Sequence, residues 1–202
     1  MLLTRRQFIT KVAASSAAIS ALACPSIAMA GKLILPTQYA SDAESRNFWD
    51  KPRVLQLKRL MPNGKWKEAE ACYWNDGALD AEGYSSICEI LGDVTYGKYI
   101  NIDIRLLNLL RGGLGWLSSN VTKDPVFIVN SGFRTKEHNN KLEGAAKNSK
   151  HLLGQAVDGR VEGMDIRDLG RLFATFQAGG VGFYVKQRFV HVDVADIRYW
   201  VK

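Results

Sequence analysis

Histidine is scarce in this 202-residue chain, which contains only His138, His151 and His191. A histidine-rich metal site would therefore have to use most of them. His151 and Asp158 are seven positions apart, so on a continuous helix they would lie about 10 Å apart along the axis. Zinc ligands lie within about 2.0–2.2 Å of the ion. A shared metal therefore requires a turn between the two residues, and Gly154 permits it because glycine adopts backbone angles that other residues avoid.

A third candidate ligand lies in the apolar segment 189–194. Strand alternation would place its three valines on one face and Phe189, His191 and Asp193 on the other. The valines could then pack into a core, while His191 and Asp193 face a site on a rigid sheet. Two histidines and one carboxylate with an open fourth position form the pattern of a catalytic rather than a structural zinc ion. Taken alone, each histidine could instead have a structural role.

Short motifs along the chain occur in the order of a known peptidase family. They are Ser131-Gly132-Phe133-Arg134, Asn139 with Leu142, S-x-H-x-x-G-x-A-x-D at 149–158, G-G-V-G-F-Y at 179–184, F-V-H-V-D at 189–193, and Arg198 with Trp200. In this order the chain resembles the YcbK-like zinc peptidases, the murein endopeptidase K branch of the D-Ala-D-Ala carboxypeptidase and L,D-endopeptidase superfamily. That superfamily shares its fold with the hedgehog signalling domain, and the resemblance covers about residues 53 to 200.

The resemblance implies roles for five residues. His151, Asp158 and His191 would bind one zinc ion per chain. Arg134 would direct its guanidinium at the substrate carbonyl or the oxyanion, where negative charge develops, and Ser149 would hydrogen-bond the substrate backbone. The alternatives are a salt bridge at a helix start for Arg134 and a helix N-cap for Ser149.

The general base is less defined. Several members of the superfamily carry a carboxylate three residues before the last histidine, but Arg188 occupies that position here and cannot accept a proton near neutral pH. Asp193 is the nearest acidic substitute on the strand face of His191. It could serve as the base or could orient a ligand imidazole, and both roles stay open. His138 is interpreted as a surface or site-rim residue.

The elements that would position these residues follow from apolar patterning and turn residues. A hairpin of strands 53–60 and 66–74 is expected around Pro62-Asn63-Gly64-Lys65. Helices are expected at 80–91, at 103–110 with an end at Gly112-Gly113, wholly or partly at 135–146, and at 166–177, with further strands at 125–131, 156–161, 181–184 and 189–194. This order favours an α+β fold. The resemblance implies its hedgehog/DD-peptidase-like form, with helices packed on an antiparallel sheet.

Composition and charge exclude several classes of protein. With 47% hydrophobic and 23% charged residues, the chain is typical of a globular domain and not of a disordered or collagen-like protein. The net charge of +7 includes three basic residues in the first thirty positions, where no acid occurs. No aromatic and basic stripe or recognition helix is evident, so no nucleic-acid partner is expected.

The N-terminus resembles a bacterial twin-arginine signal peptide. Arg5 and Arg6 precede an apolar run at 12–23, which is too short to form a stable membrane span, and Ala28-Met29-Ala30 has the pattern of a cleavage site. We therefore expect a signal peptide at 1–30, a flexible lead-in at 31–52 and a zinc peptidase domain at 53–202. An uncleaved membrane anchor is the alternative. In the periplasm, Cys72 and Cys88 could form one disulfide or remain two buried thiols.

The expected function is that of an exported zinc metallopeptidase that hydrolyses amide bonds in the stem peptides or cross-links of peptidoglycan. Its partners would be peptidoglycan and the twin-arginine export machinery. The sequence does not distinguish an endopeptidase from a carboxypeptidase. Because Arg188 replaces the usual carboxylate, the alternative is a non-catalytic, zinc-containing protein that binds the cell wall.

Overall fold

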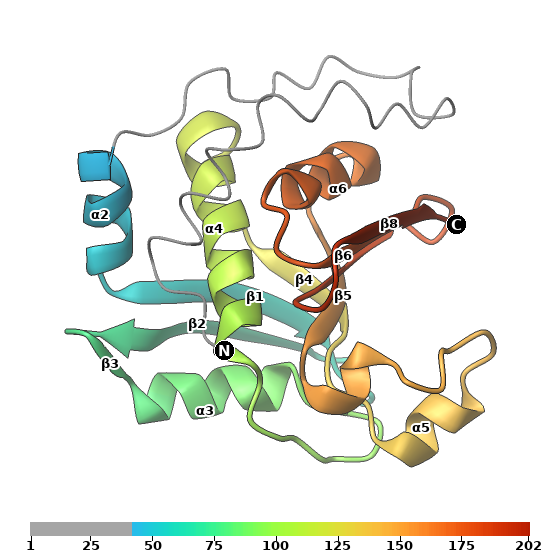
Figure 1. The fold of residues 1–202 in the computed structure, drawn as a ribbon. Helices are drawn as coiled ribbons and strands as arrows, with labels where there is room; N and C mark the ends of the chain where they lie inside the picture. Colours follow the sequence, from blue (N-terminus) through green and yellow to red (C-terminus); the bar gives the residue numbers. More distant parts are fainter. Residues whose placement is uncertain (1–41) are drawn as a thin grey trace.

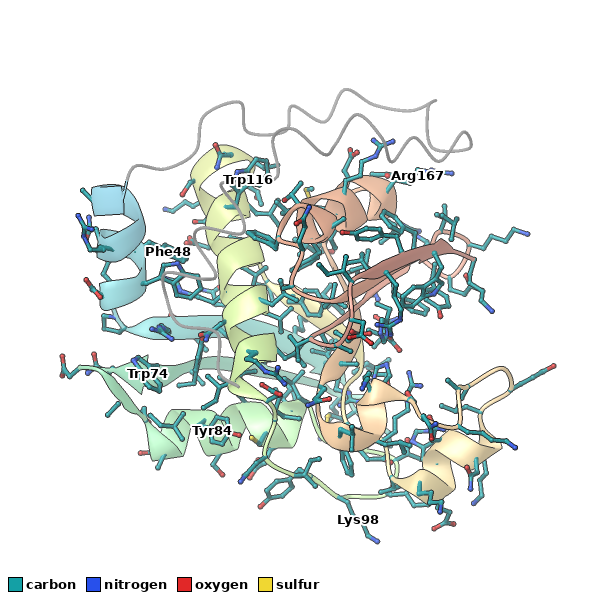
Figure 2. The ribbon with its side chains drawn as sticks, in the orientation of Figure 1. Phe48, Trp74, Tyr84, Lys98, Trp116 and Arg167 are labelled. Carbon is teal, nitrogen blue, oxygen red and sulfur yellow. The ribbon has the colours of Figure 1, made fainter. Side chains whose placement is uncertain are left out.

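A computed structural model describes residues 42–202 of the chain. Residues 1–41 lie outside that part, and so do the expected signal peptide and the first half of the expected lead-in. The rest of the lead-in was expected to be extended or flexible, but it is mostly the helix α2 (Asp42–Asp50). Phe48 on α2 lies beside the helix that carries Gly115 (Figure 2). A Cβ atom on Gly115 would lie 2.4 Å from Cζ of Phe48. This contact packs α2 onto the domain.

Within residues 42–202 the strands form one mixed sheet in the order β3-β2-β1-β4-β5-β7-β6-β8 (Figure 1). All neighbours are antiparallel except β1 with β4 and β6 with β8. The strands are β1 (Arg53–Leu60), β2 (Trp66–Asn75), β3 (Ala78–Leu79), β4 (Phe127–Ser131), β5 (Ala156–Val161), β6 (Gly180–Tyr184), β7 (Phe189–Asp193) and β8 (Arg198–Val201). The expected α+β fold is confirmed, with a sheet that is mostly rather than wholly antiparallel.

Four further helices follow α2 in the described residues, and three of them pack against the sheet. They are α3 (Ala81–Ile90), α4 (Ile104–Asn120), α5 (Lys136–Lys141) and α6 (Ile166–Thr175), with the short 3-10 helix η3 (Lys150–Leu153). Helices α3 and α4 pack against β1, and α6 packs against β6 and β7 beside α4 (Figure 1). Val190 and Val192 of β7 are fully buried on the α6 side. Strand alternation therefore puts His191 on the opposite face, away from α6.

The sheet consists of two halves. One half is β3-β2-β1 and the other is β4-β5-β7-β6-β8. They are joined by a parallel register of three residue pairs, in which Leu57, Lys58 and Arg59 of β1 lie opposite residues 127–129 of β4. The candidate ligands His151, Asp158 and His191 belong to the second half or to the short helix beside it.

Helix α4 is longer than the sequence indicated. We expected it to end at Gly112-Gly113, but it continues to Asn120. The glycines are interior positions where neighbouring rings approach the helix axis: a Cβ atom on Gly113 would lie 2.6 Å from Cε1 of Phe173. Packing against α6 therefore outweighs the low helix propensity of glycine.

Helix α5 is shorter than the upper limit expected. Thr135 caps its start, and the helix ends at Lys141 instead of about residue 146. Beyond it, Gly144 has a φ angle of 72°, and the Asn139 side chain donates a hydrogen bond to the carbonyl of Ala146. This turn and hydrogen bond fold the following segment back beside the helix.

Cys72 and Cys88 are both free thiols, so of the two alternatives the structure shows unbridged cysteines. Cys72 is partly exposed and Cys88 is buried, and the Ile102 backbone N–H donates to the sulfur of Cys88 at 3.5 Å.

None of the helices in residues 42–202 combines the length and apolar character needed to cross a membrane.

Replacing Gly113 with alanine should destabilise the domain. The new methyl group would press on Phe173, whose ring is only 1% exposed and has no room to move away. Overpacking of this kind costs about 1–3 kcal/mol, whereas alanine gains roughly 0.8–1 kcal/mol over glycine in helix propensity. The free energy of unfolding, measured with denaturant, should therefore fall. Ser118→Ala on the exposed face of α4 is the matched control, and equal losses in both variants would contradict the close helix contact.

Candidate metal centre

His151 is held in η3 by a turn at each end. The Ser149 side chain accepts a hydrogen bond from the His151 backbone N–H, and Gly154 ends the helix in the left-handed region at φ 63°. The turn between His151 and Asp158 that the sequence required is therefore present. His151 Nδ1 lies 2.6 Å from the carbonyl oxygen of Gly132. Because a carbonyl can only accept, Nδ1 carries the proton, and the lone pair of the neutral ring is on Nε2.

Asp158 and His191 lie opposite each other on the paired strands β5 and β7. His191 Nε2 is 3.0 Å from Oδ2 of Asp193. This contact places the proton of the neutral ring on Nε2 and leaves Nδ1 with the lone pair. Nδ1 then lies 2.8 Å from Asp158 Oδ1 and 3.2 Å from His151 Nε2.

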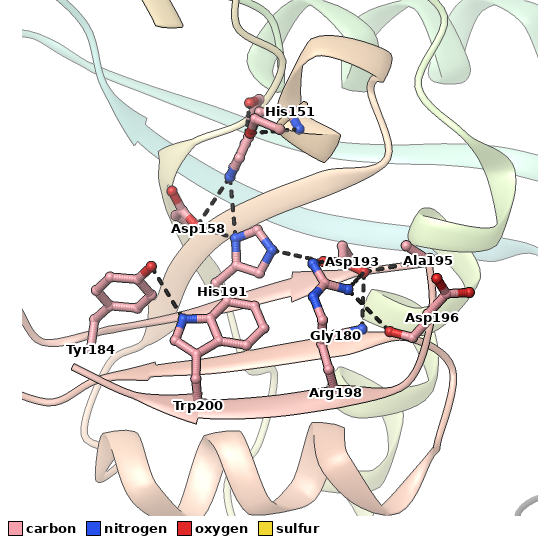
Figure 3. Close-up of polar contacts among 12 residues, drawn as sticks. His151, Asp158, Gly180, Tyr184, His191, Asp193, Ala195, Asp196, Arg198 and Trp200 are labelled. Atoms are coloured by element: carbon pink, nitrogen blue, oxygen red, sulfur yellow. Dashed lines mark hydrogen bonds and ion pairs between the residues drawn. The ribbon is translucent and has the colours of Figure 1, made fainter. Parts of the chain in front are cut away.

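Three acceptor atoms thus converge in a buried position (Figure 3). One ligand atom from each of His151, Asp158 and His191 lies within 4.8 Å of the others. The outer nitrogens, His151 Nδ1 and His191 Nε2, carry the protons. No hydrogen atom therefore stands between the inner nitrogens, His151 Nε2 and His191 Nδ1, and their lone pairs and that of Asp158 face a common point. Such an arrangement is unfavourable when empty and suits a cation. The donor set of two imidazoles and one carboxylate fits zinc.

The electrostatics favour the ligand forms of His151 and Asp158 but not that of His191. Burial lowers the pKa of His151, and the charge of Asp158 offsets only part of this effect, which favours the neutral ring. Burial alone would raise the pKa of Asp158, but both histidines hold it well below its ordinary value. Burial would lower the pKa of His191, yet the carboxylates at its two nitrogens raise it. A metal ion would therefore compete with a proton at His191.

Arg134 lies beside the three candidate ligands. Its Nη2 donates to Asp158 Oδ2 at 2.5 Å and its Nε donates to the Ser131 hydroxyl at 2.8 Å. Nη1 has no partner among residues 42–202, although the side chain is only 13% exposed. The chain just before Arg134 lies so close to Leu91 that a Cβ atom on Gly132 would be 2.1 Å from the Leu91 carbonyl oxygen. Only glycine fits there, so Gly132 permits the position of Arg134. The N–H groups of Nη1 are thus left for another group.

The remaining predicted residues have different surroundings. Ser149 caps η3, as its structural alternative required, and is partly exposed. Asp193 is fully buried and contacts the outer nitrogen of His191 rather than the inner one. Arg188 lies in the β6–β7 turn at φ 59°. Sequence reasoning missed the partner of Asp193, which is Arg198 at 2.6 Å, although Arg198 was part of the recognised motif.

The carboxylate of Asp93 anchors the segment that follows Arg134. Its Oδ2 accepts hydrogen bonds from the backbone N–H and the hydroxyl of Thr135, at 2.8 and 2.9 Å. Its Oδ1 lies 3.0 Å from His138 Nδ1. His138 therefore belongs to the hydrogen-bonded group around Asp93 and lies outside the group of three candidate ligands.

Replacing Asp93 with asparagine should destabilise the protein in a pH-dependent way. Burial raises the pKa of this carboxyl, but the hydrogen bonds from Thr135 and His138 outweigh burial and lower it overall. A lowered pKa stabilises the fold above the unfolded value of about 3.9, and this contribution is lost as pH falls through the folded value. The difference in unfolding free energy between wild type and variant should be full at pH 6–7 and should shrink below about pH 4. A constant difference in denaturant titrations across that range would contradict this account.

Comparison with known proteins identifies the family of this chain. A family model described as Peptidoglycan L,D-endopeptidase MepK matches residues 48–200. The peptidoglycan L,D-endopeptidase MepK of Escherichia coli K12 is 31% identical over 174 residues, which cover 84% of this chain and 90% of that protein. The probable peptidoglycan L,D-endopeptidase MepK of Haemophilus influenzae is 39% identical over 57 residues, 28% of this chain and 31% of that protein. No solved structure shows a significant match. The family match spans every residue of the centre, and the chain belongs to the MepK family of peptidoglycan L,D-endopeptidases.

Proposed function

We propose that this protein is an exported, zinc-dependent peptidase that hydrolyses amide bonds in the stem peptides or cross-links of peptidoglycan. One observation carries the proposal: three lone pairs from His151, Asp158 and His191 converge, and the outer nitrogen of each imidazole is held by a separate acceptor. The Escherichia coli relative is a peptidoglycan L,D-endopeptidase and the Haemophilus influenzae relative a probable one, which supports an L,D bond as the target and endopeptidase rather than carboxypeptidase activity.

In this proposal His151 Nε2, Asp158 Oδ1 and His191 Nδ1 hold one zinc ion per chain. When bound at such a site, zinc lowers the pKa of a water molecule toward 7 and polarises a carbonyl group, so no protein nucleophile is needed. Asp158 keeps a single oxygen for the metal because Arg134 holds the other one. The fourth position then stays open for water and substrate.

Arg134 and Ser149 would bind the substrate. The free Nη1 of Arg134 would donate to the carbonyl oxygen of the scissile amide and stabilise the negative charge that develops there. The Ser149 oxygen already accepts from the His151 backbone, so its own proton is available to donate to the substrate backbone. Both side chains adjoin His151 or Asp158, which would place the amide over the metal.

Asp193 has two proposed roles, and its contacts support the orienting one. Its oxygens accept from the backbone N–H groups of Gly180 and Ala195, from Arg198 and from His191. A general base needs an oxygen within hydrogen-bond reach of the proton that it removes. Asp193 lies on the outer side of the His191 ring and is 0% exposed, so it would keep the proton on Nε2 and fix the ring.

Export would bring the enzyme to its substrate. We propose that residues 1–30 direct the protein through the twin-arginine machinery to the periplasm and are then removed. Peptidoglycan would be the partner there. The competing proposal, a zinc-containing protein that binds the wall without cleaving it, draws on Arg188, which provides no carboxylate at the position that several relatives use.

Digestion of isolated sacculi separates catalysis from binding. Purified wild type should contain about one zinc per chain and release soluble peptide fragments, a chelator should stop the release, and added zinc should restore it. His151→Ala should lose both zinc and activity, whereas the matched control His138→Ala, outside the group of three, should keep its zinc. Binding to sacculi without any released fragment would favour the wall-binding alternative, and mass spectrometry of the fragments would identify the bond.

Asp193→Asn distinguishes the two roles of Asp193. If the carboxylate is the base, turnover on muropeptides should fall about a hundredfold to ten-thousandfold with zinc saturating. If it orients His191, the main effect should be a loss of about tenfold to a hundredfold in zinc affinity, largely recovered at high zinc. We expect the second result. A large loss of turnover at full zinc occupancy would instead establish the base.

A further inference from the structure

Strand β8 supplies two side chains that reach across its neighbour to the metal centre. In the parallel register of β6 and β8, Gly180 lies opposite Arg198 and Gly182 lies opposite Trp200. A Cβ atom on Gly180 would lie 2.4 Å from Nη1 of Arg198, and one on Gly182 would lie 2.5 Å from Cε2 of Trp200. Arg198 and Trp200 therefore occupy the space that side chains on Gly180 and Gly182 would fill. Figure 3 shows both side chains on the side of the sheet that carries His191.

The guanidinium of Arg198 ends on the carboxylate of Asp193. Nη2 donates to Oδ2 at 2.6 Å and Nη1 donates to Oδ1 at 3.2 Å, which is a two-point contact of the kind that only arginine makes. Nη1 also donates to the Asp196 carbonyl oxygen at 3.0 Å, so the guanidinium itself is fixed. Because Asp193 is 0% exposed, Arg198 supplies both charge compensation and orientation to a buried carboxylate.

Trp200 contacts the same histidine from another side. Its ring centroid lies 5.2 Å from that of His191, and the Arg198 guanidinium lies over the Trp200 ring at 5.1 Å. The Trp200 N–H donates to the Tyr184 hydroxyl at 3.3 Å. His191 is thus held at Nε2 by the Arg198–Asp193 pair and beside its ring by Trp200.

We propose that Arg198 is a positioning residue of the metal centre, which acts through Asp193 to hold His191 Nδ1 toward the metal, and that Gly180 is required so that Arg198 can reach Asp193. This inference rests on the proposed zinc site. Arg198 touches none of the three ligands, so its effect should pass through Asp193. Loss of an outer partner of a ligand histidine typically costs tenfold to a hundredfold in metal affinity.

The test measures zinc affinity of the purified protein by competition with a chelator of known affinity, without any activity assay. Arg198→Met should weaken zinc binding tenfold to a hundredfold. Arg198→Lys, which keeps the charge but offers no planar two-point contact, should fall between wild type and Arg198→Met. The matched control is Arg105→Met, because Arg105 makes a similar two-point contact with Asp103 at the start of α4 and should leave zinc affinity unchanged.

A double variant tests the route through Asp193. If Arg198 acts through this carboxylate, Arg198→Met should cause little further loss of zinc affinity in an Asp193→Asn background, so the two effects should not add. Gly180→Ala provides a second approach, since its Cβ atom would lie 2.4 Å from Arg198 Nη1 and 2.7 Å from Asp193 Oδ2. It should displace this pair without removing either partner, and should also weaken zinc binding about tenfold. Circular dichroism and the unfolding midpoint verify that each variant is folded.

The outcomes are distinguishable. Unchanged zinc affinity in folded Arg198→Met and Gly180→Ala, or additive losses in the double variant, would overturn the role of Arg198 and leave the proposed function intact. Failure of the wild type to bind zinc at all would instead overturn the proposed function. Equal losses in Arg198→Met and Arg105→Met would show that any lost ion pair has the same effect, and would also overturn the proposal.

Discussion

The central constraint on this structure is that the hydrogen bond at one nitrogen of a histidine decides which nitrogen keeps the lone pair that a metal needs. His151 uses the carbonyl of Gly132 and His191 uses the carboxylate of Asp193. Each partner fixes a tautomer. The two tautomers leave lone pairs on His151 Nε2 and His191 Nδ1, and these two nitrogens lie 3.2 Å apart. Much of the surrounding structure serves to hold those two partners still.

Glycine makes this support possible at positions where a backbone or a long side chain must approach closely. Gly132 lets its strand end touch the carbonyl of Leu91, and its own carbonyl then reaches His151. Gly180 opens the space through which Arg198 contacts Asp193. The candidate metal centre therefore depends on the absence of side chains at these glycines as much as on His151, Asp158 and His191.

Local pattern was enough to predict which three side chains the structure brings together and most of the elements around them. Alternation in β7 placed His191 and Asp193 on one face, and Gly154 marked the turn after His151. The length of α4 could not be predicted, because its glycines are explained by rings from other elements. The partner of Asp193 was missed for a similar reason: the Arg198 contact depends on the parallel register of β6 and β8, which connects segments with no local signal for pairing.

The junction between the two halves of the sheet has a mechanical consequence. Only three residue pairs of β1 and β4 connect the halves along the sheet, and the candidate ligands are outside the β3-β2-β1 half. A bound ion would therefore cross-link β5, η3 and β7 but would not connect any of these three elements to the β1–β2 hairpin. When the domain opens locally, the hairpin half could exchange its amide hydrogens with solvent while the ligand half stays closed.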